Sequence, residues 1–259
     1  MTVSDSAHAP VPPMLELRSI SKSFGNTRAL TEVGLRVESG TVHTVLGENG
    51  SGKSTLVKIL SGVTIPDSGD IVVDGSAESI RTPKGARRLG IATVYQEVLV
   101  APNRSVRENV LLGTDGYFRK KVRGKARRDA AAAALRAVSD AEFPLDAECG
   151  TLNLMQQHQV TIARALTSAP RLLILDESTA ALDIVARDRL FAAVRDHVAS
   201  GGSVIFISHR MDEVLEISDA VTVLRSGSVV ATLRRDELSE RRLLGLLNPE
   251  LAHEEDRSK

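Results

Sequence analysis

The sequence LGENGSGKST, residues 46–55, decides the fold. It follows TVHTVL (41–46), a run rich in β-branched residues that is typical of a strand, and it leads into STLVKIL (54–60), whose apolar residues have helical spacing. Residues 47–54 match the pattern G-x-x-x-x-G-K-[ST], and a preceding strand and a following helix are the context in which this pattern binds phosphate groups. The stretch therefore predicts a phosphate-binding loop between a strand and a helix.

The residue types of this loop indicate how it would hold ATP and Mg²⁺. Glycines let successive backbone N–H groups converge on phosphate oxygens, and the start of the next helix adds positive potential. We expect Lys53 to reach the β- and γ-phosphates, Ser54 to offer its hydroxyl to Mg²⁺, and Thr55 to contact the α-phosphate. The alternative is a glycine-rich turn with a chance lysine, which the strand-loop-helix context disfavours. The predicted nucleotide-binding residues of the loop are Gly47, Glu48, Asn49, Gly50, Ser51, Gly52, Lys53, Ser54 and Thr55.

A second motif lies downstream, where the aliphatic run LLIL (172–175) ends in Asp176 and Glu177. Carboxylates at the end of a buried strand need a cation or hydrogen-bond donors. Asp176 is suited to hold Mg²⁺ directly or through water, and Glu177 is suited to accept a proton from an attacking water. The alternative is that the pair only caps the next helix, because carboxylates favour helix starts. Together the two motifs predict that the bound nucleotide is hydrolysed.

The order of the remaining patterns predicts an α/β fold. LELRSI (15–20) and VGLRVES (33–39) alternate apolar and polar residues, as half-buried antiparallel strands do. Buried-type strands alternate with helical patterns such as 184–200, which predicts a parallel sheet with helices on both faces. VTVLRSGSVVATL (221–233) predicts a closing hairpin around Ser226 and Gly227.

Composition excludes several classes of protein. The 259 residues are 42% hydrophobic, so they can bury a core, and the single cysteine excludes an internal disulfide framework. No run of eighteen apolar residues and no secretory leader is present, so we expect a chain that is soluble by itself. Equal numbers of basic and acidic residues and 3% aromatics argue against nucleic acid as a partner. The basic run 119–128 is interpreted as a solvated loop leading into the helix DAAAAALRAV (129–138), or alternatively as a contact for phosphate groups.

With these residues in place, the chain resembles the nucleotide-binding subunit of ABC transporters over residues 14–233. Gln96 in VYQEV is placed like the glutamine that senses Mg²⁺ in that family, and His209 in ISHRMDEV like its switch histidine. Phe24 matches the aromatic residue that stacks on adenine, and STAALD (178–183) is similar to the D-loop. The resemblance implies a P-loop NTPase (RecA-like) parallel sheet core, with an antiparallel β subdomain and an inserted helical lobe. It also implies catalytic roles for Glu177, His209 and Gln96, and Mg²⁺ contacts from Ser54, Gln96 and Asp176.

Within that family, LGENGSGKSTLVKILSGV, YQE, ENVLLG and ISHRMDEV are most similar to the ATPases of carbohydrate importers. The resemblance implies an ATPase at the cytoplasmic face of the membrane that energises a permease, with an extracytoplasmic solute-binding protein as a further partner. It also implies a second ATP-binding subunit, because each site is completed by the opposite subunit. Import of sugars is inherited from the likeness alone. A low-turnover regulatory nucleotide switch and a soluble ABC-type ATPase acting on nucleic acid are the alternatives.

One family motif is altered. The signature LSGGQ should precede the helix QQHQVTIARAL, but the aligned residues 152–156 read LNLMQ. We expect Asn153 and Gln156 to face the nucleotide of the other subunit, with Asn153 as a longer substitute for serine. Met155 places a thioether where backbone must approach an anion, and one lost charge-assisted hydrogen bond costs about 1.5–3 kcal/mol, roughly 10- to 150-fold in closure. Self-pairing, pairing with a subunit bearing an intact signature, and a fragment of a two-copy protein all remain open.

The pattern along the chain also predicts its domain organisation. We expect a disordered tail over residues 1–13, an ATP-binding domain over 14–247 with its helical lobe at about 97–161, and a charged tail over 248–259.

Overall fold

A computed structural model describes residues 12–113 and 124–248. The predicted tails therefore fall almost wholly outside the described residues, as does the first half of the basic run 119–128. In the described part of the chain, no helix is both long enough and apolar enough to cross a membrane.

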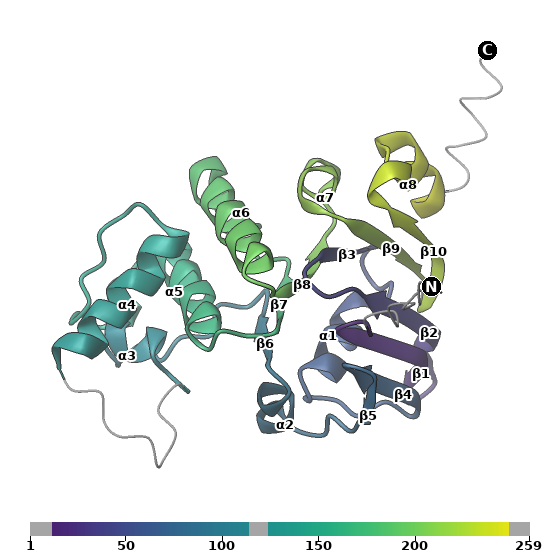
Figure 1. The fold of residues 1–259 in the computed structure, drawn as a ribbon, viewed down its shortest axis with the longest axis horizontal. Helices are drawn as coiled ribbons and strands as arrows, with labels where there is room; N and C mark the ends of the chain where they lie inside the picture. Colours follow the sequence, from purple (N-terminus) through teal and green to yellow (C-terminus); the bar gives the residue numbers. More distant parts are fainter. Residues whose placement is uncertain (1–11, 114–123, 249–259) are drawn as a thin grey trace, which may run out of the picture.

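Two sheets form the body of the molecule (Figure 1). The first is antiparallel and four-stranded, in the order β2-β1-β4-β5, with β1 at Leu15–Phe24, β2 at Thr27–Val37, β4 at Ser68–Val73 and β5 at Ser76–Glu78. The second is six-stranded, in the order β10-β9-β3-β8-β7-β6, with β3 at Val42–Leu46, β6 at Ile91–Val94, β7 at Leu172–Asp176, β8 at Ser203–Ser208, β9 at Ala220–Arg225 and β10 at Ser228–Arg234. The antiparallel strands predicted at residues 15–20 and 33–39 are present, and they pair with each other, with Leu15 opposite Val37.

The six-stranded sheet is parallel except at one edge. Strands β9, β3, β8, β7 and β6 run parallel to their neighbours, whereas β10 pairs antiparallel with β9. The turn between β9 and β10 holds Ser226 and Gly227 at φ 49° and 79°, which confirms the predicted hairpin. Because parallel strands end at the same edge, the residues that follow β3, β6, β7 and β8 lie side by side.

Helices cover both faces of this sheet. Alternate residues of β7 show it, because Leu173 and Leu175 pack into one hydrophobic cluster while Leu172 and Ile174 pack into another. The first cluster joins the sheet to the helical lobe, and the second joins it to the antiparallel sheet. The helices are α1 at Lys53–Leu60, α2 at Pro83–Arg88, α3 at Val106–Val110, α4 at Lys125–Val138, α5 at Leu154–Thr167, α6 at Ile184–Ala199, α7 at Met211–Ile217 and α8 at Glu240–Leu247.

The helical lobe consists of α3, α4 and α5, which pack together on one side of the molecule (Figure 1). Its chain leaves the sheet after β6 and returns to it at β7. The prediction of a loop up to residue 128 is wrong in part, because α4 begins at Lys125. The basic residues from Lys125 onward therefore belong to the first turn of the helix, and its buried face consists of Ala131, Leu135 and Val138.

Candidate functional site

The phosphate loop lies between β3 and α1, as the sequence predicts. Gly52 caps α1 with φ 107°, a conformation that residues with a Cβ rarely adopt. A Cβ on Gly52 would lie 2.6 Å from the carbonyl oxygen of Ala29, and a Cβ on Gly47 would lie 2.4 Å from that of Leu224. Neighbouring backbone thus encloses the loop so closely that glycine is required at both positions.

Lys53 is folded into the centre of this loop. Its Nζ donates hydrogen bonds to the carbonyl oxygens of Gly47 (2.7 Å) and Glu48 (2.9 Å), and its side chain is buried. Burial lowers the pKa of Lys53, although nearby carboxylates, led by Glu177, act in the opposite direction. The ammonium group therefore lies inside the phosphate loop. It is hydrogen-bonded there to carbonyl oxygens, which phosphate oxygens can replace.

Asp176 ends β7 as a buried carboxyl group. It is 8% exposed, and burial, reinforced by the charge of Glu177, raises the pKa of Asp176 to about 6. Burial disfavours the ionised form of this carboxyl group, and a bound cation would stabilise that form. The exposed hydroxyl of Ser54 stands at the start of α1, whereas Thr55 is half-buried. Carboxylate and hydroxyl oxygens are ligands that Mg²⁺ accepts, so this residue set fits the metal.

The structure brings Gln96, Glu177 and His209 together at the ends of β6, β7 and β8. Gln96 Nε2 donates a hydrogen bond to Glu177 Oε2 (3.0 Å), and His209 Nδ1 lies 3.7 Å from Glu177 Oε1. Glu177 itself has φ 46°, a left-handed conformation that costs a glutamate energy, and its N–H donates to the carbonyl oxygen of Ile207 (3.0 Å). The backbone therefore holds this carboxylate in a fixed direction; the catalytic roles of the three residues stay predictions.

The alternative that Asp176 and Glu177 cap the next helix is wrong. Asp183 is the N-cap of α6, and its Oδ1 accepts a hydrogen bond from the N–H of Ala186 (2.8 Å). The two acids are thus separated from the helix by residues 178–183, the segment that resembles the D-loop.

Asn153 and Gln156 lie in the helical lobe, apart from the phosphate loop. Asn153 is the N-cap of α5: its Oδ1 accepts from the N–H of Gln156 (2.9 Å), and Gln156 Oε1 accepts from the N–H of Asn153 (3.3 Å). The expectation that the signature precedes the helix is wrong, because Leu154, Met155 and Gln156 form its first turn. This reciprocal capping box explains the earlier start.

Phe24 ends β1 and borders the solvent. Its side chain is 50% exposed, and Lys22 Nζ lies 5.5 Å from the centre of its ring. Stacking on adenine stays a prediction for this residue.

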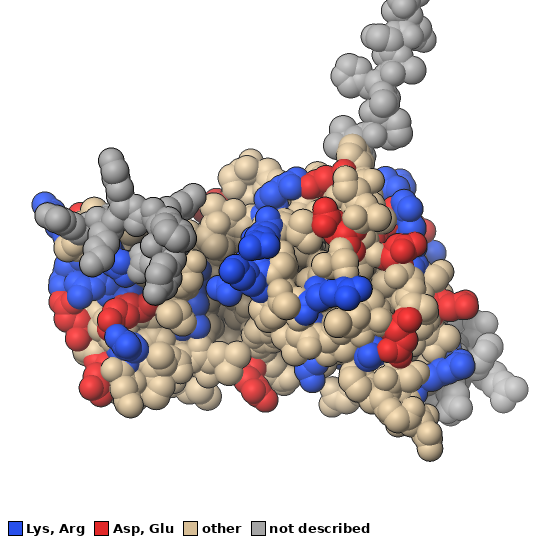
Figure 2. Space-filling view, turned by 90° about the horizontal axis from the view of Figure 1, so that it is seen from below, with Lys and Arg blue, Asp and Glu red and all other residues tan. Residues whose placement is uncertain are grey.

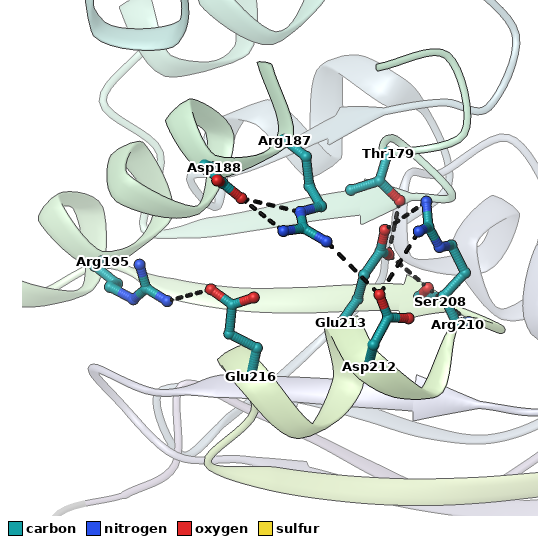
Figure 3. Close-up of polar contacts among 9 residues, drawn as sticks. All are labelled: Thr179, Arg187, Asp188, Arg195, Ser208, Arg210, Asp212, Glu213 and Glu216. Atoms are coloured by element: carbon teal, nitrogen blue, oxygen red, sulfur yellow. Dashed lines mark hydrogen bonds and ion pairs between the residues drawn. The ribbon is translucent and has the colours of Figure 1, made fainter. Parts of the chain in front are cut away.

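Sequence reasoning missed a polar cluster in which the buried side chains of Thr179, Ser208 and Glu213 meet the exposed Arg210 (Figure 3). Glu213 is fully buried on α7, on the same helix face as Val214 and Ile217. A glutamate inside the apolar face of a short helix is the signal that points to this cluster, because such a position normally holds an apolar residue.

Comparisons with known proteins agree with this geometry. The family model described as ABC transporter matches residues 30–180. The chain is 45% identical over 242 residues to the ribose import ATP-binding protein RbsA 2 of Burkholderia pseudomallei (strain 1710b), which covers 92% of this chain and 47% of that protein. It is 43% identical over 235 residues to RbsA 2 of Escherichia coli O157:H7, covering 91% of this chain and 46% of that protein. The chain thus spans about half the length of these curated relatives.

Solved structures show the same fold. An ATP-binding cassette of an ABC transporter in its ADP conformation is 26% identical, with a TM-score of 0.76 over 90% of this chain and 98% of that one. The structure of cbiO1 from Clostridium perfringens, part of the ABC transporter complex cbiONQ, is 27% identical, with a TM-score of 0.74 over 95% and 99% of the two chains. The prediction of a P-loop α/β fold is therefore confirmed.

Proposed function

Because this chain belongs to the ABC transporter family, we propose that it binds and hydrolyses ATP to energise a membrane transporter of sugars or similar small solutes. One observation carries the proposal: the ends of four strands bring Lys53, Asp176, Glu177, Gln96 and His209 to a single edge of the sheet. The kind of cargo rests on the relatives, which are ribose import proteins.

Mg²⁺ would be held by Asp176, Ser54 and Gln96. The raised pKa of Asp176 and the exposed hydroxyl of Ser54 support this set. Bound there, the metal would neutralise charge on the β- and γ-phosphate oxygens.

Four residues of the chain have separate roles in the proposed hydrolysis. The ammonium of Lys53 exchanges its bonds to loop carbonyls for bonds to the β- and γ-phosphates. Glu177 accepts a proton from the water whose oxygen attacks the γ-phosphorus, and ADP leaves. His209, 3.7 Å from the same carboxylate, stabilises the charge that develops on the γ-phosphoryl group, while the amide of Gln96 orients Glu177.

A second ATP-binding subunit completes each site. Asn153 and Gln156 are proposed to face the nucleotide of that subunit from the first turn of α5, whose N–H groups are suited to an anion. Met155 is half-buried in this turn, and its thioether side chain is proposed to crowd the approach of that nucleotide. We favour pairing with a partner that bears an intact signature, because this chain retains Glu177 and His209, which an impaired site would not use.

A hollow between the sheet and the helical lobe is the proposed docking site for a cytoplasmic loop of the permease. Its volume is about 220 Å³, and α2, β6, α5 and the segment after Gln96 line it. Leu99 and Leu112, two apolar residues of the lining, are 52% and 58% exposed. Figure 2 shows the face on which α2 lies, with Lys and Arg side chains gathered near its middle. Such docking would hold the chain at the cytoplasmic side of the membrane, with a solute-binding protein acting on the opposite side.

Phosphate release from Mg–ATP by the purified chain tests the proposal. We expect measurable turnover that Lys53→Ala abolishes along with nucleotide binding, because the variant loses the ammonium at the centre of the loop. Lys84→Ala is the control, since it removes an exposed ammonium from α2. Parental turnover in Lys53→Ala, or no Mg–ATP binding by the folded parent, would refute the assignment.

Met155 favours one alternative, a subunit that binds ATP and rarely cleaves it. Addition of a partner subunit with an intact signature separates the two functions. Turnover that rises on mixing supports the transporter ATPase, whereas unchanged slow turnover supports the regulatory switch.

A further inference from the structure

Glu213 carries a carboxylate in the interior of the molecule without contact to solvent. It lies on α7, and its exposed fraction is 0%. Burying a carboxylate is costly unless hydrogen bonds and an opposite charge compensate, so its partners indicate what the position is used for.

The partners of Glu213 come from two different segments (Figure 3). Its Oε2 accepts a hydrogen bond from Thr179 Oγ1 (2.8 Å) and another from Ser208 Oγ (2.9 Å). Its Oε1 lies 3.1 Å from Nη1 of Arg210. One carboxylate oxygen is thus shared by two hydroxyl groups, while the guanidinium supplies the opposite charge.

These partners stand next to the residues proposed for hydrolysis. Thr179 follows Glu177 by two residues, and Ser208 and Arg210 flank His209. The ends of β7 and β8 are joined a second time by the hydrogen bond from the Glu177 N–H to the Ile207 carbonyl oxygen. The side-chain link and the backbone link therefore constrain the same two strand ends.

We propose that Glu213 is a positioning residue, which holds the segments of Glu177 and His209 in register so that their side chains keep the spacing hydrolysis requires. This inference rests on the proposed ATPase function. The hydroxyl of Thr179 also connects Glu213 to residues 178–183, so a displacement of that segment reaches His209 through one carboxylate.

Ion pairs on the surface also hold α7 in place, but they do not substitute for the buried contacts of Glu213. Asp212 lies 3.6 Å from a guanidinium nitrogen of both Arg187 and Arg210, and Arg195 Nη2 lies 2.9 Å from Glu216 Oε1. The pairs of Arg187 and Arg195 join α6 to α7, but they are solvent-exposed on at least one side, and such pairs contribute little. The buried carboxylate of Glu213 is therefore the contact that fixes the segment of Glu177 relative to the segment of His209.

The test removes the two hydroxyl groups without emptying the core. Thr179→Val and Ser208→Ala are made singly and together, with Thr167→Val as the matched control, because the Thr167 hydroxyl bonds only carbonyl oxygens of α3 and α5. We expect each single change to lower kcat about 10-fold, the effect of one hydrogen bond to a charged group, with KM and Mg–ATP affinity within about twofold. The double variant is expected to be no slower than the slower single variant, since both bonds act through one carboxylate.

Amide hydrogen exchange provides a readout that does not need turnover. Removing either hydroxyl is expected to speed exchange both in 176–183 and in 207–213, while Thr167→Val changes neither. Acceleration confined to the mutated segment, or parental kcat in both single variants, would overturn the role of Glu213. If the parent binds no Mg–ATP, the proposed function fails, and the exchange pattern still decides whether Glu213 couples the two segments.

Glu213 itself is changed in two ways. Glu213→Gln keeps an oxygen that accepts from the two hydroxyl groups, so it should retain more kcat than Glu213→Ala. Equal kcat in these two variants, both folded, would also contradict the inference; should Glu213→Ala not fold, the hydroxyl variants decide.

Discussion

His43 makes the stability of the phosphate-binding sheet sensitive to mild acid. It lies on β3, the strand that leads into the phosphate loop, and it is buried with Nε2 2.8 Å from Thr222 Oγ1. Burial lowers the pKa of His43 from 6.5 to about 4. Below pH 6.5 the unfolded chain therefore takes up a proton that the folded chain refuses until about pH 4.

The sign and size of the effect follow from this difference. Folding stability from His43 is fully present above pH 6.5 and is lost as the pH falls toward 4, with a loss of about 3 kcal/mol in total and about 2 kcal/mol by pH 5. Asp176 acts in the opposite direction, because its raised pKa lets the folded chain bind a proton between about pH 4 and 6. Only a comparison that leaves Asp176 unchanged isolates the histidine.

Urea unfolding of the parent and of His43→Gln at pH 7 and pH 5 makes that comparison. Glutamine does not titrate and can still bond Thr222, so the variant lacks the proton linkage alone. The free energy of unfolding should fall by about 2 kcal/mol more in the parent than in the variant between the two pH values. Parallel losses in the two proteins would refute a buried neutral His43.

Three further predictions concern the site and the altered signature. Glu177→Gln should keep Mg–ATP affinity and lower kcat at least about 100-fold, the usual contribution of a general base; phosphate release checks it, and parental kcat would exclude Glu177 as the base. Met155→Gly should raise the turnover of the isolated chain about 10-fold by restoring one charge-assisted contact, and unchanged turnover would show that Met155 does not limit closure. Asn153→Ala should lower the free energy of unfolding by about 1 kcal/mol through loss of the α5 cap, measured by thermal melting, whereas no loss would show that the cap contributes nothing.

Local patterns were predictable from the sequence where one rule dominates. The strand-loop-helix around Lys53 and the hairpin at Ser226 and Gly227 follow from backbone requirements of a few neighbouring residues, and the structure has both. The antiparallel pair at residues 15–20 and 33–39 follows from alternation of apolar and polar residues.

Helix starts were predicted less well, because two rules compete there. The reciprocal bonds of Asn153 and Gln156 start α5 before the point that the family signature indicates. At α4, the basic residues predict a solvated loop up to residue 128, but the helix begins at Lys125. Packing of its buried face, which includes Ala131 and Leu135, stabilises this longer helix.

The link that Glu213 makes to the Glu177 segment was not predicted, because Thr179, its partner there, is distant in sequence. Thr179 lies 34 residues away, and no local pattern connects the two positions. Contacts of this kind depend on the order of strands in the sheet, which places the ends of β7 and β8 next to each other.

Among the described residues, strand β6, which precedes Gln96, lies at one edge of its sheet and pairs only with β7, over four residues. Gln96 stands just beyond this short ladder, so a shift of β6 against β7 would lengthen its hydrogen bond to Glu177. The 3.0 Å bond between Gln96 and Glu177 therefore depends on how the end of β6 lies against the end of β7, and a spectroscopic probe at either residue would report a relative shift of the two strand ends.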